Sequence, residues 1–157
     1  MKSDQLHTDF KEFIELLNAQ KVDYLVVGAF AVASYGVVRN TGDIDVWVNQ
    51  TEENMTRLVQ VLAAFGFAGL GHTVADFMEP EIIVQLGVVP FRIDLLTVID
   101  GVSFEECYPQ RKITVLDGVS VVVLGMEDLQ KNKASTGRAK DAEDLRLLKL
   151  RKSDSAE

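Results

Sequence analysis

Asp43 and Asp45 are the residues whose type and spacing point most directly to chemistry. Apolar and other residues alternate over residues 43–48, which predicts a strand with its aliphatic side chains on one face. Residues two apart in a strand share a face and lie about 6.5–7 Å apart, so both carboxylates can approach one cation. Hard oxygen ligands of this kind favour Mg²⁺ or Mn²⁺.

A second segment, residues 91–95, repeats the alternation. Its apolar residues form one face and leave Arg92 and Asp94 on the other. On an adjacent strand, Asp94 would bring a third carboxylate to the same cation, which suits metal-assisted in-line displacement at phosphorus. The alternative, left open by the residues, is that Asp94 forms a salt bridge with Arg92 or a lysine at the edge of the strand.

Upstream of these strands, Val26-Val27-Gly28-Ala29 predicts a strand that passes through a glycine turn into a helix. Such a turn exposes backbone N–H groups to which phosphate oxygens can bind. The turn matters here because Asp43 and Asp45 follow it closely in the chain.

The elements that must position these residues follow from periodicity and turn signals. Helices are expected over residues 8–20, 29–35, 126–133 and 140–152, with a further helix capped by Thr51. Strands are expected over residues 24–27, 43–48, 81–86, 91–96, 111–116 and 119–124, the last four as two hairpins. We therefore expect one α/β (α+β) domain over residues 1–157, with a core at about 22–150 and a mixed or antiparallel sheet flanked by helices.

The composition and charge of the chain exclude some classes of binding partner. The 157 residues include 24 acidic and 16 basic side chains, a formal charge of −8, which argues against non-specific DNA binding and against an anionic membrane. Half of the basic residues lie over 131–152. This segment is either a solvated helix face or a cationic surface that neutralises an anion held by the acidic body. The single cysteine, Cys107, cannot form an internal disulfide, so we expect a cytoplasmic protein.

These motifs together resemble a known superfamily. Gly28-Ala29 followed by Arg39-Asn40-Thr41-Gly42-Asp43-Ile44-Asp45-Val46 resembles the signature of the nucleotidyltransferase (DNA polymerase β-like) superfamily. It is most similar to the minimal nucleotidyltransferases related to AbiEii-type toxins. The segment from Lys133 through Gly137-Arg138-Ala139-Lys140-Asp141 to Asp144-Leu145 resembles the closing motif of that group.

The resemblance implies roles for these residues. Asp43 and Asp45 would hold Mg²⁺ (or Mn²⁺) and the phosphates of an NTP substrate, and Asp94 would complete the metal site and help to deprotonate the acceptor. Gly28 and Ala29 would lie against the phosphates, although Ala29 stands where the family has Gly or Ser. Candidates for triphosphate contacts are Arg39, Lys133, Arg138 and Lys140, the last two being equally compatible with surface positions at a helix start.

The expected function is Mg²⁺-dependent transfer of NMP from an NTP to a hydroxyl or an RNA 3′ end. By the same resemblance, the protein would be a toxin with an RNA or protein acceptor and an antitoxin partner. Two alternatives stay open. One is a catalytically weak or inactive nucleotide-binding or regulatory module, suggested by Ala29. The other is an interaction partner in a two-gene pair, in which the fold serves as a surface.

Overall fold

The protein folds around one mixed six-stranded β-sheet with helices on either side. A computed structural model describes residues 7–39, 42–66, 71–88 and 91–155. The strands lie in the order β3-β4-β2-β1-β6-β5. They are β1 (Tyr24–Val27), β2 (Asp43–Val48), β3 (Ile83–Val88), β4 (Phe91–Leu96), β5 (Lys112–Leu116) and β6 (Val119–Val123). The expected α/β fold with a mixed sheet is therefore confirmed.

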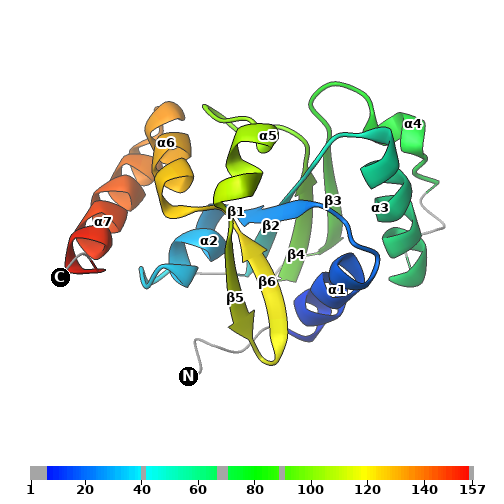
Figure 1. Cartoon of the computed structure of the whole chain (residues 1–157), viewed down its shortest axis with the longest axis horizontal. Helices are drawn as coiled ribbons and strands as arrows, with labels where there is room; N and C mark the ends of the chain where they lie inside the picture. The colour runs from blue at the N-terminus through cyan, green and yellow to red at the C-terminus, as the bar shows by residue number, and fades with distance from the viewer. Residues whose placement is uncertain (1–6, 40–41, 67–70, 89–90, 156–157) are drawn as a thin grey trace.

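Two groups of helices flank the sheet (Figure 1). On one side, α1 packs against β6 and α3, and α3 packs against α4; on the other, α6 packs against α7. The short helix α2 lies directly against β1 and β2. The helices are α1 (Thr8–Ala19), α2 (Gly28–Ser34), α3 (Glu52–Ala64), α4 (Val74–Phe77), α5 (Phe104–Cys107), α6 (Met126–Ser135) and α7 (Ala139–Ser155), with a 3₁₀ turn over Tyr108–Gln110.

The centre of the sheet combines parallel and antiparallel pairs. β1 runs antiparallel to β2 and parallel to β6, while β2 runs parallel to β4. The two outer hairpins, β3–β4 and β5–β6, are antiparallel as expected. Since β2 and β4 are parallel neighbours, their first residues lie at the same end of the sheet.

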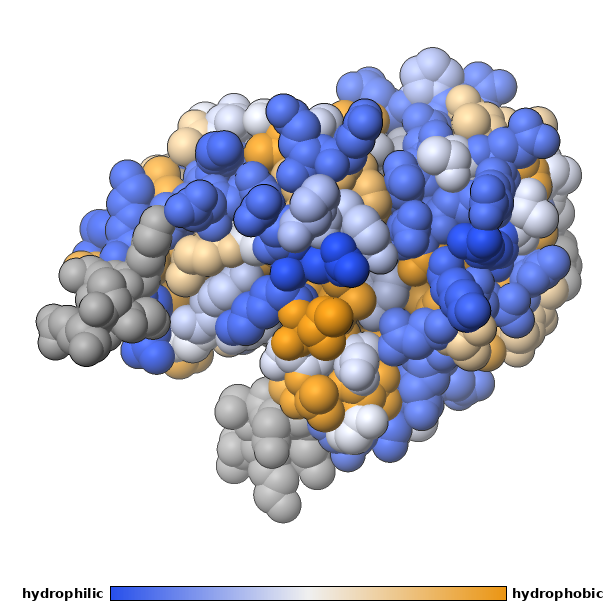
Figure 2. All heavy atoms as spheres, viewed as in Figure 1, coloured by the Kyte–Doolittle hydropathy of each residue, from blue (hydrophilic) through white to orange (hydrophobic). Residues whose placement is uncertain are grey.

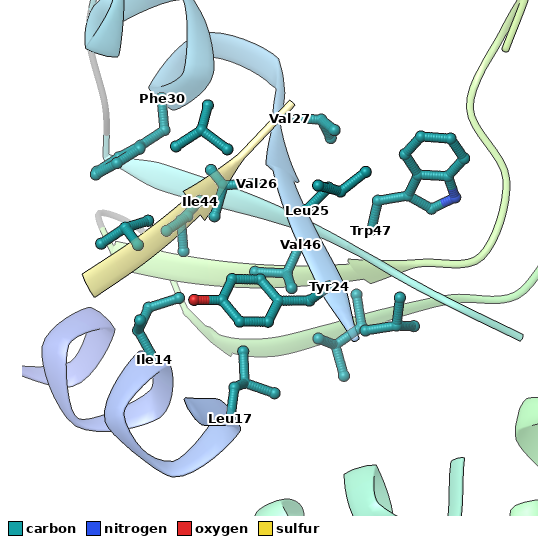
Figure 3. Close-up of a cluster of buried hydrophobic side chains, with 14 of the residues drawn as sticks. Ile14, Leu17, Tyr24, Leu25, Val26, Val27, Phe30, Ile44, Val46 and Trp47 are labelled. Carbon is teal, nitrogen blue, oxygen red and sulfur yellow. The ribbon is translucent and has the colours of Figure 1, made fainter. Parts of the chain in front are cut away.

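Buried aliphatic and aromatic side chains fix the central strands in place (Figure 3). Ile14 and Leu17 of α1 lie against this cluster, and β1 is buried along its whole length. Trp47 of β2 is also fully buried: its indole N–H donates to the Thr97 carbonyl at 3.1 Å, and the Phe104 ring contacts it edge-on. The aspartate-bearing face of β2 is thus covered at its far end.

Most element boundaries agree with the sequence to within a few residues, and the differences have physical causes. The strand expected from residue 81 begins at Ile83, because Glu81 adopts a left-handed backbone with φ +51°, which cannot continue a ladder. The helix expected over 140–152 starts at Ala139 and extends to Ser155. Thr51 caps α3 as predicted, accepting a hydrogen bond from the Asn54 N–H. The expected turn residues Asn40, Thr41 and Pro90 lie outside the described residues.

One edge of the sheet carries exposed apolar side chains. Ile113 and Val115 of the edge strand β5 are exposed. Figure 2 shows hydrophobic residues gathered on the surface over the β5–β6 hairpin. Within the described ranges, no helix combines the length and the apolar character that crossing a membrane requires.

Candidate active site

Four polar side chains occupy matched positions on β2 and β4. In the parallel register Asp43 lies opposite Arg92, and Asp45 lies opposite Asp94. Because side chains two apart on a strand share a face, all four project from the same side of the sheet. The structure thus brings together the three carboxylates that the sequence singled out.

The strands can present these charges because their other face is buried. Ile44 and Val46 of β2, like Ile93 and Leu95 of β4, are at most 3% exposed. The apolar residues anchor both strands in the core, so the intervening residues must point the opposite way. The alternation visible in the sequence therefore determines which way the carboxylates face.

Gly28 closes the site from the neighbouring strand. β1 ends at Val27, whose Cα partner on β2 is Asp45, and Gly28 then opens α2 with φ +71°. A Cβ on Gly28 would lie 2.2 Å from Asp45 Oδ2, a distance that no side chain could tolerate without displacing the aspartate. Glycine is required here both for its backbone conformation and for the space beside Asp45.

Arg92 lies between two of the carboxylates. Its Nε donates to Asp94 Oδ1 at 2.8 Å, and its terminal nitrogen donates to Asp94 Oδ2 at 3.2 Å and to Asp43 Oδ2 at 3.3 Å. The hydrogen bond to Asp94 and the negative charges nearby raise the pKa of the Arg92 guanidinium. The salt bridge between Asp94 and Arg92, one of the two alternatives considered, is therefore present, and Asp94 also lies opposite Asp45 in the register.

The electrostatics of the cluster are dominated by its negative charge. Burial, followed by the charges of Asp94 and Asp43, raises the pKa of Asp45 to about 6, and the Arg92 charge only partly offsets this. A nearby cation would stabilise the charged form of a carboxyl group whose pKa is raised in this way.

This donor set fits a hard divalent cation by its chemistry, since carboxylate oxygens are the ligands that Mg²⁺ and Mn²⁺ prefer. Burial raises the pKa of Asp45 most, and the charges of Asp94 and Asp43 add to it; this neighbouring negative charge supports the same fit. In the arrangement seen here, however, Arg92 engages Asp43 and Asp94. Across the described residues, no three His, Cys, Asp or Glu side chains are grouped closely enough to hold a metal ion.

The predicted phosphate-binding cations lie near the carboxylates but are largely committed to other partners. Lys133 is buried, with its Nζ 2.8 Å from Asp141 Oδ1 and 3.2 Å from Asp144 Oδ2. Arg39 pairs with the other oxygen of Asp144, and Arg138 Nε lies 2.8 Å from Asp141 Oδ2. These two arginines, Lys133 and the two aspartates form what we call the α6–α7 ion-pair network.

The α6–α7 ion-pair network favours the ionised form of Asp141. Burial alone would raise its pKa, but hydrogen bonds from Lys133 and Thr136 and the charges of Lys133 and Arg138 outweigh burial, so the pKa of Asp141 is lowered. Lys140 is exposed and, in the described part of the chain, is the one predicted phosphate-binding cation that makes no ion pair.

The carboxylates and the cations face one cavity of about 770 Å³. It contains every predicted site residue except Arg39, which reaches it only through Asp144. The lining residues are Gly28, Ala29, Gly42, Asp43, Asp45, Phe91, Arg92, Asp94, Lys133, Arg138, Lys140, Asp141 and Asp144.

Asp141, Asp144 and Phe91 line the cavity, although no separate role was predicted for them from the sequence. The spacing of three between the two aspartates was an available signal, because it places both on one helix face toward Lys133. Phe91 offered no comparable signal. It lies at the start of β4, where its ring is partly exposed and stacks on His7 at 3.8 Å between centroids.

A second cavity, of about 800 Å³, lies between α5, the start of α6 and Tyr35. Its lining includes Cys107 and Asp128 but none of the carboxylates of β2 and β4. Burial, followed by the charge of Asp128, raises the pKa of the Cys107 thiol to about 12. Cys107 is fully buried, so the thiol stays protonated and is unsuited to act as a nucleophile.

Comparison with solved structures identifies the fold. A candidate nucleotidyltransferase from Thermotoga maritima, TM1012, superposes with a TM-score of 0.57 at 16% identity, covering 87% of this chain and 88% of that one. The antibiotic-resistance factor ANT(2″)-Ia superposes with a TM-score of 0.55 at 14% identity, covering 90% of this chain and 80% of that one. At these identities the likeness establishes the shared fold alone.

Comparison with curated proteins found no match. A family model, by contrast, matches residues 4–156 and is described as a nucleotidyltransferase of unknown function, DUF6036. The match spans both carboxylate strands and the α6–α7 ion-pair network, so the superfamily inferred from the motifs is confirmed. The chain belongs to the DUF6036 family of nucleotidyltransferases.

Proposed function

We propose that the protein transfers a nucleoside monophosphate from an NTP to an acceptor hydroxyl, with Mg²⁺ or Mn²⁺ held by Asp43, Asp45 and Asp94. One observation carries the proposal: three carboxylates from adjacent strands face a cavity whose lining also contains Lys133, Arg138 and Lys140. An anionic substrate bridged to carboxylates by a divalent cation needs both kinds of surface.

The bound metal would supply charge neutralisation at the phosphates and at the acceptor oxygen. In the reaction, the acceptor oxygen forms a bond to the α-phosphorus while the bond from that phosphorus to the bridging oxygen breaks. Pyrophosphate leaves, and Asp94 accepts the proton of the hydroxyl. Gly28 and Ala29 bound the cavity beside Asp45 and leave room for the phosphates.

The cations of the cavity divide into two roles. Lys140 and Arg138 are exposed, and we assign to them the stabilisation of charge on the departing pyrophosphate. Lys133 and Arg39 are held by Asp141 and Asp144 and would position α7 against the site. The acceptor we favour is an RNA 3′ end or a protein hydroxyl. A role as a toxin controlled by an antitoxin is part of the proposal.

The direct test is transfer of label from α-³²P NTPs to total RNA or lysate protein, with the full chain and Mg²⁺. We expect Asp43→Asn and Asp45→Asn to reduce transfer by about a hundredfold or more, since each removes a charge needed in the transition state. Asp117→Asn is the matched control, because Asp117 lies in the β5–β6 turn and pairs with Lys11 outside the cavity.

Transfer that survives both cavity substitutions would refute the assignment. Calorimetry with a non-hydrolysable NTP distinguishes an active enzyme from a module that only binds nucleotides. Tight binding without any transfer would instead favour a nucleotide-binding module, for which the Ala29 methyl group in the cavity is the motivating feature.

A further inference from the structure

The Arg92 guanidinium lies between a carboxylate of β2 and a carboxylate of β4. It binds both oxygens of Asp94, at 2.8 and 3.2 Å, and one oxygen of Asp43, at 3.3 Å. Its side chain is only 28% exposed. One cation thus joins carboxylates from two strands, β2 and β4.

The strand register places Arg92 within reach of these carboxylates. Arg92 lies directly opposite Asp43, and Asp94 lies two residues further along the same face. Two carboxylates on β2 therefore face one carboxylate and one guanidinium on β4. Without Arg92, three acidic side chains would remain close together with no cation among them, which is costly in a partly buried site.

A divalent cation would need the oxygens that Arg92 already holds. Both oxygens of Asp94 and one of Asp43 are engaged, and two positive charges at the same oxygens repel one another.

We propose that Arg92 is a positioning residue that sets the affinity of the carboxylate cluster for divalent cations. The inference rests on the proposed function. Arg92 holds Asp43 and Asp94 while the metal is absent and must withdraw from them when a cation binds. It lines the same cavity as Arg138 and Lys140, so the phosphates of an NTP offer the displaced guanidinium a new anionic partner.

This arrangement couples metal binding to nucleotide binding. A nucleotide that pairs with the Arg92 guanidinium removes it from the carboxylates and so raises their affinity for the metal. By thermodynamic linkage, the metal raises the affinity for the nucleotide by the same factor. Removing the guanidinium should therefore strengthen metal binding by the free protein and weaken the coupling. A residue that only stabilised the fold would change neither quantity.

The experiment measures Mn²⁺ binding to the full chain by electron paramagnetic resonance, with and without a non-hydrolysable NTP. We expect Arg92→Gln to bind Mn²⁺ at least about tenfold more tightly than the wild type in the absence of nucleotide, because a nearby charge shifts such equilibria by about one unit or more. The further gain on adding nucleotide should be smaller than in the wild type. Arg146→Gln is the matched control, since it removes the same charge from an exposed pair on α7 and should leave both values unchanged.

Arg92→Lys guards against a variant that does not fold. Lysine keeps the charge but cannot bind both oxygens of Asp94 in the same way, so its Mn²⁺ affinity should lie between those of wild type and Arg92→Gln. Equal or weaker Mn²⁺ binding in folded Arg92 variants, with normal binding by the wild type, would overturn this proposal alone. Absence of Mn²⁺ binding in every variant would overturn both it and the metal dependence of the proposed function.

Discussion

The pair formed by Arg39 and Asp144 offers a decisive test of how α7 is held to the rest of the molecule. Arg39 follows α2, while Asp144 lies 105 residues later on α7 and is only 1% exposed. Asp144 also binds Lys133 at 3.2 Å. The perturbation is a double-mutant cycle with Arg39→Gln, Asp144→Asn and the two substitutions combined.

The expected cost follows from burial and distance. Two unit charges about 4 Å apart attract by roughly 4 kcal/mol at an effective dielectric constant of about 20. Removing one partner of a buried pair typically costs about 3–5 kcal/mol, because the other charge stays buried without its partner. Arg39 is partly exposed, and Lys133 retains Asp141, so we expect Asp144→Asn to lower the free energy of unfolding by about 3 kcal/mol, the lower end of that range.

Urea denaturation followed by circular dichroism measures this cost, and the coupling of the double mutant should exceed about 1 kcal/mol. The same cycle on Glu143 and Arg146 is the control, since this pair lies on the same helix but is 51% and 60% exposed. Its coupling should be about 0.5 kcal/mol or less. Equal couplings in the two cycles would refute the reasoning that burial, and not the mere presence of an ion pair, makes this contact strong.

Two further predictions concern the glycine turn and alkaline pH. Gly28→Ala should lower the free energy of unfolding by more than the roughly 1–2 kcal/mol of backbone strain alone, because its Cβ must displace Asp45. Gly118→Ala, with φ +78° and open space around it, measures that strain by itself in the same urea titration, and equal costs would contradict the clash. Burial raises the pKa of Tyr24 to about 12 and that of Cys107 to about 12, so the unfolded chain loses these protons first. The free energy of unfolding should then be insensitive to both groups below about pH 7. It should begin to fall as Cys107 ionises in the unfolded chain near its ordinary pKa of about 8.5, and fall further toward pH 12 as Tyr24 does so near about 10. A flat profile across that range in urea titrations would be inconsistent with buried neutral groups.

Much of the fold could be predicted from local sequence signals. Alternation over residues 43–48 and 91–95 predicted both carboxylate strands, and the Asp117-Gly118 turn predicted the β5–β6 hairpin. These features can be recognised locally. In a half-buried strand apolar and polar side chains alternate with a period of two residues, and a tight turn requires particular residue types. The errors lie at element ends, as at Glu81, where the backbone conformation depends on neighbouring contacts, and at the short helices α4 and α5, which were not expected from the sequence.

The partners of the charged residues could not be predicted in this way. Three cations expected to contact phosphates, Arg39, Lys133 and Arg138, pair with Asp141 or Asp144 in the structure, and these pairs were not predicted from the sequence. A charge in the sequence carries no information about which of several carboxylates it will meet, since that depends on how α6 and α7 pack. Trp47 illustrates the same limit: alternation places it on the face of the aspartates, but Phe104, from a distant segment, covers it.

The sequence by itself determined the chemistry of this protein: two carboxylates at a spacing of two, a third on a similar strand, and a glycine turn before them. Periodicity was enough, because it decides which side chains share a face. Only the tertiary structure decided that β2 and β4 are parallel neighbours in the register that sets Asp45 beside Asp94 and Arg92 beside Asp43. Register arises from the packing of buried faces across the whole sheet, and it is the register that places the Arg92 guanidinium among the carboxylates.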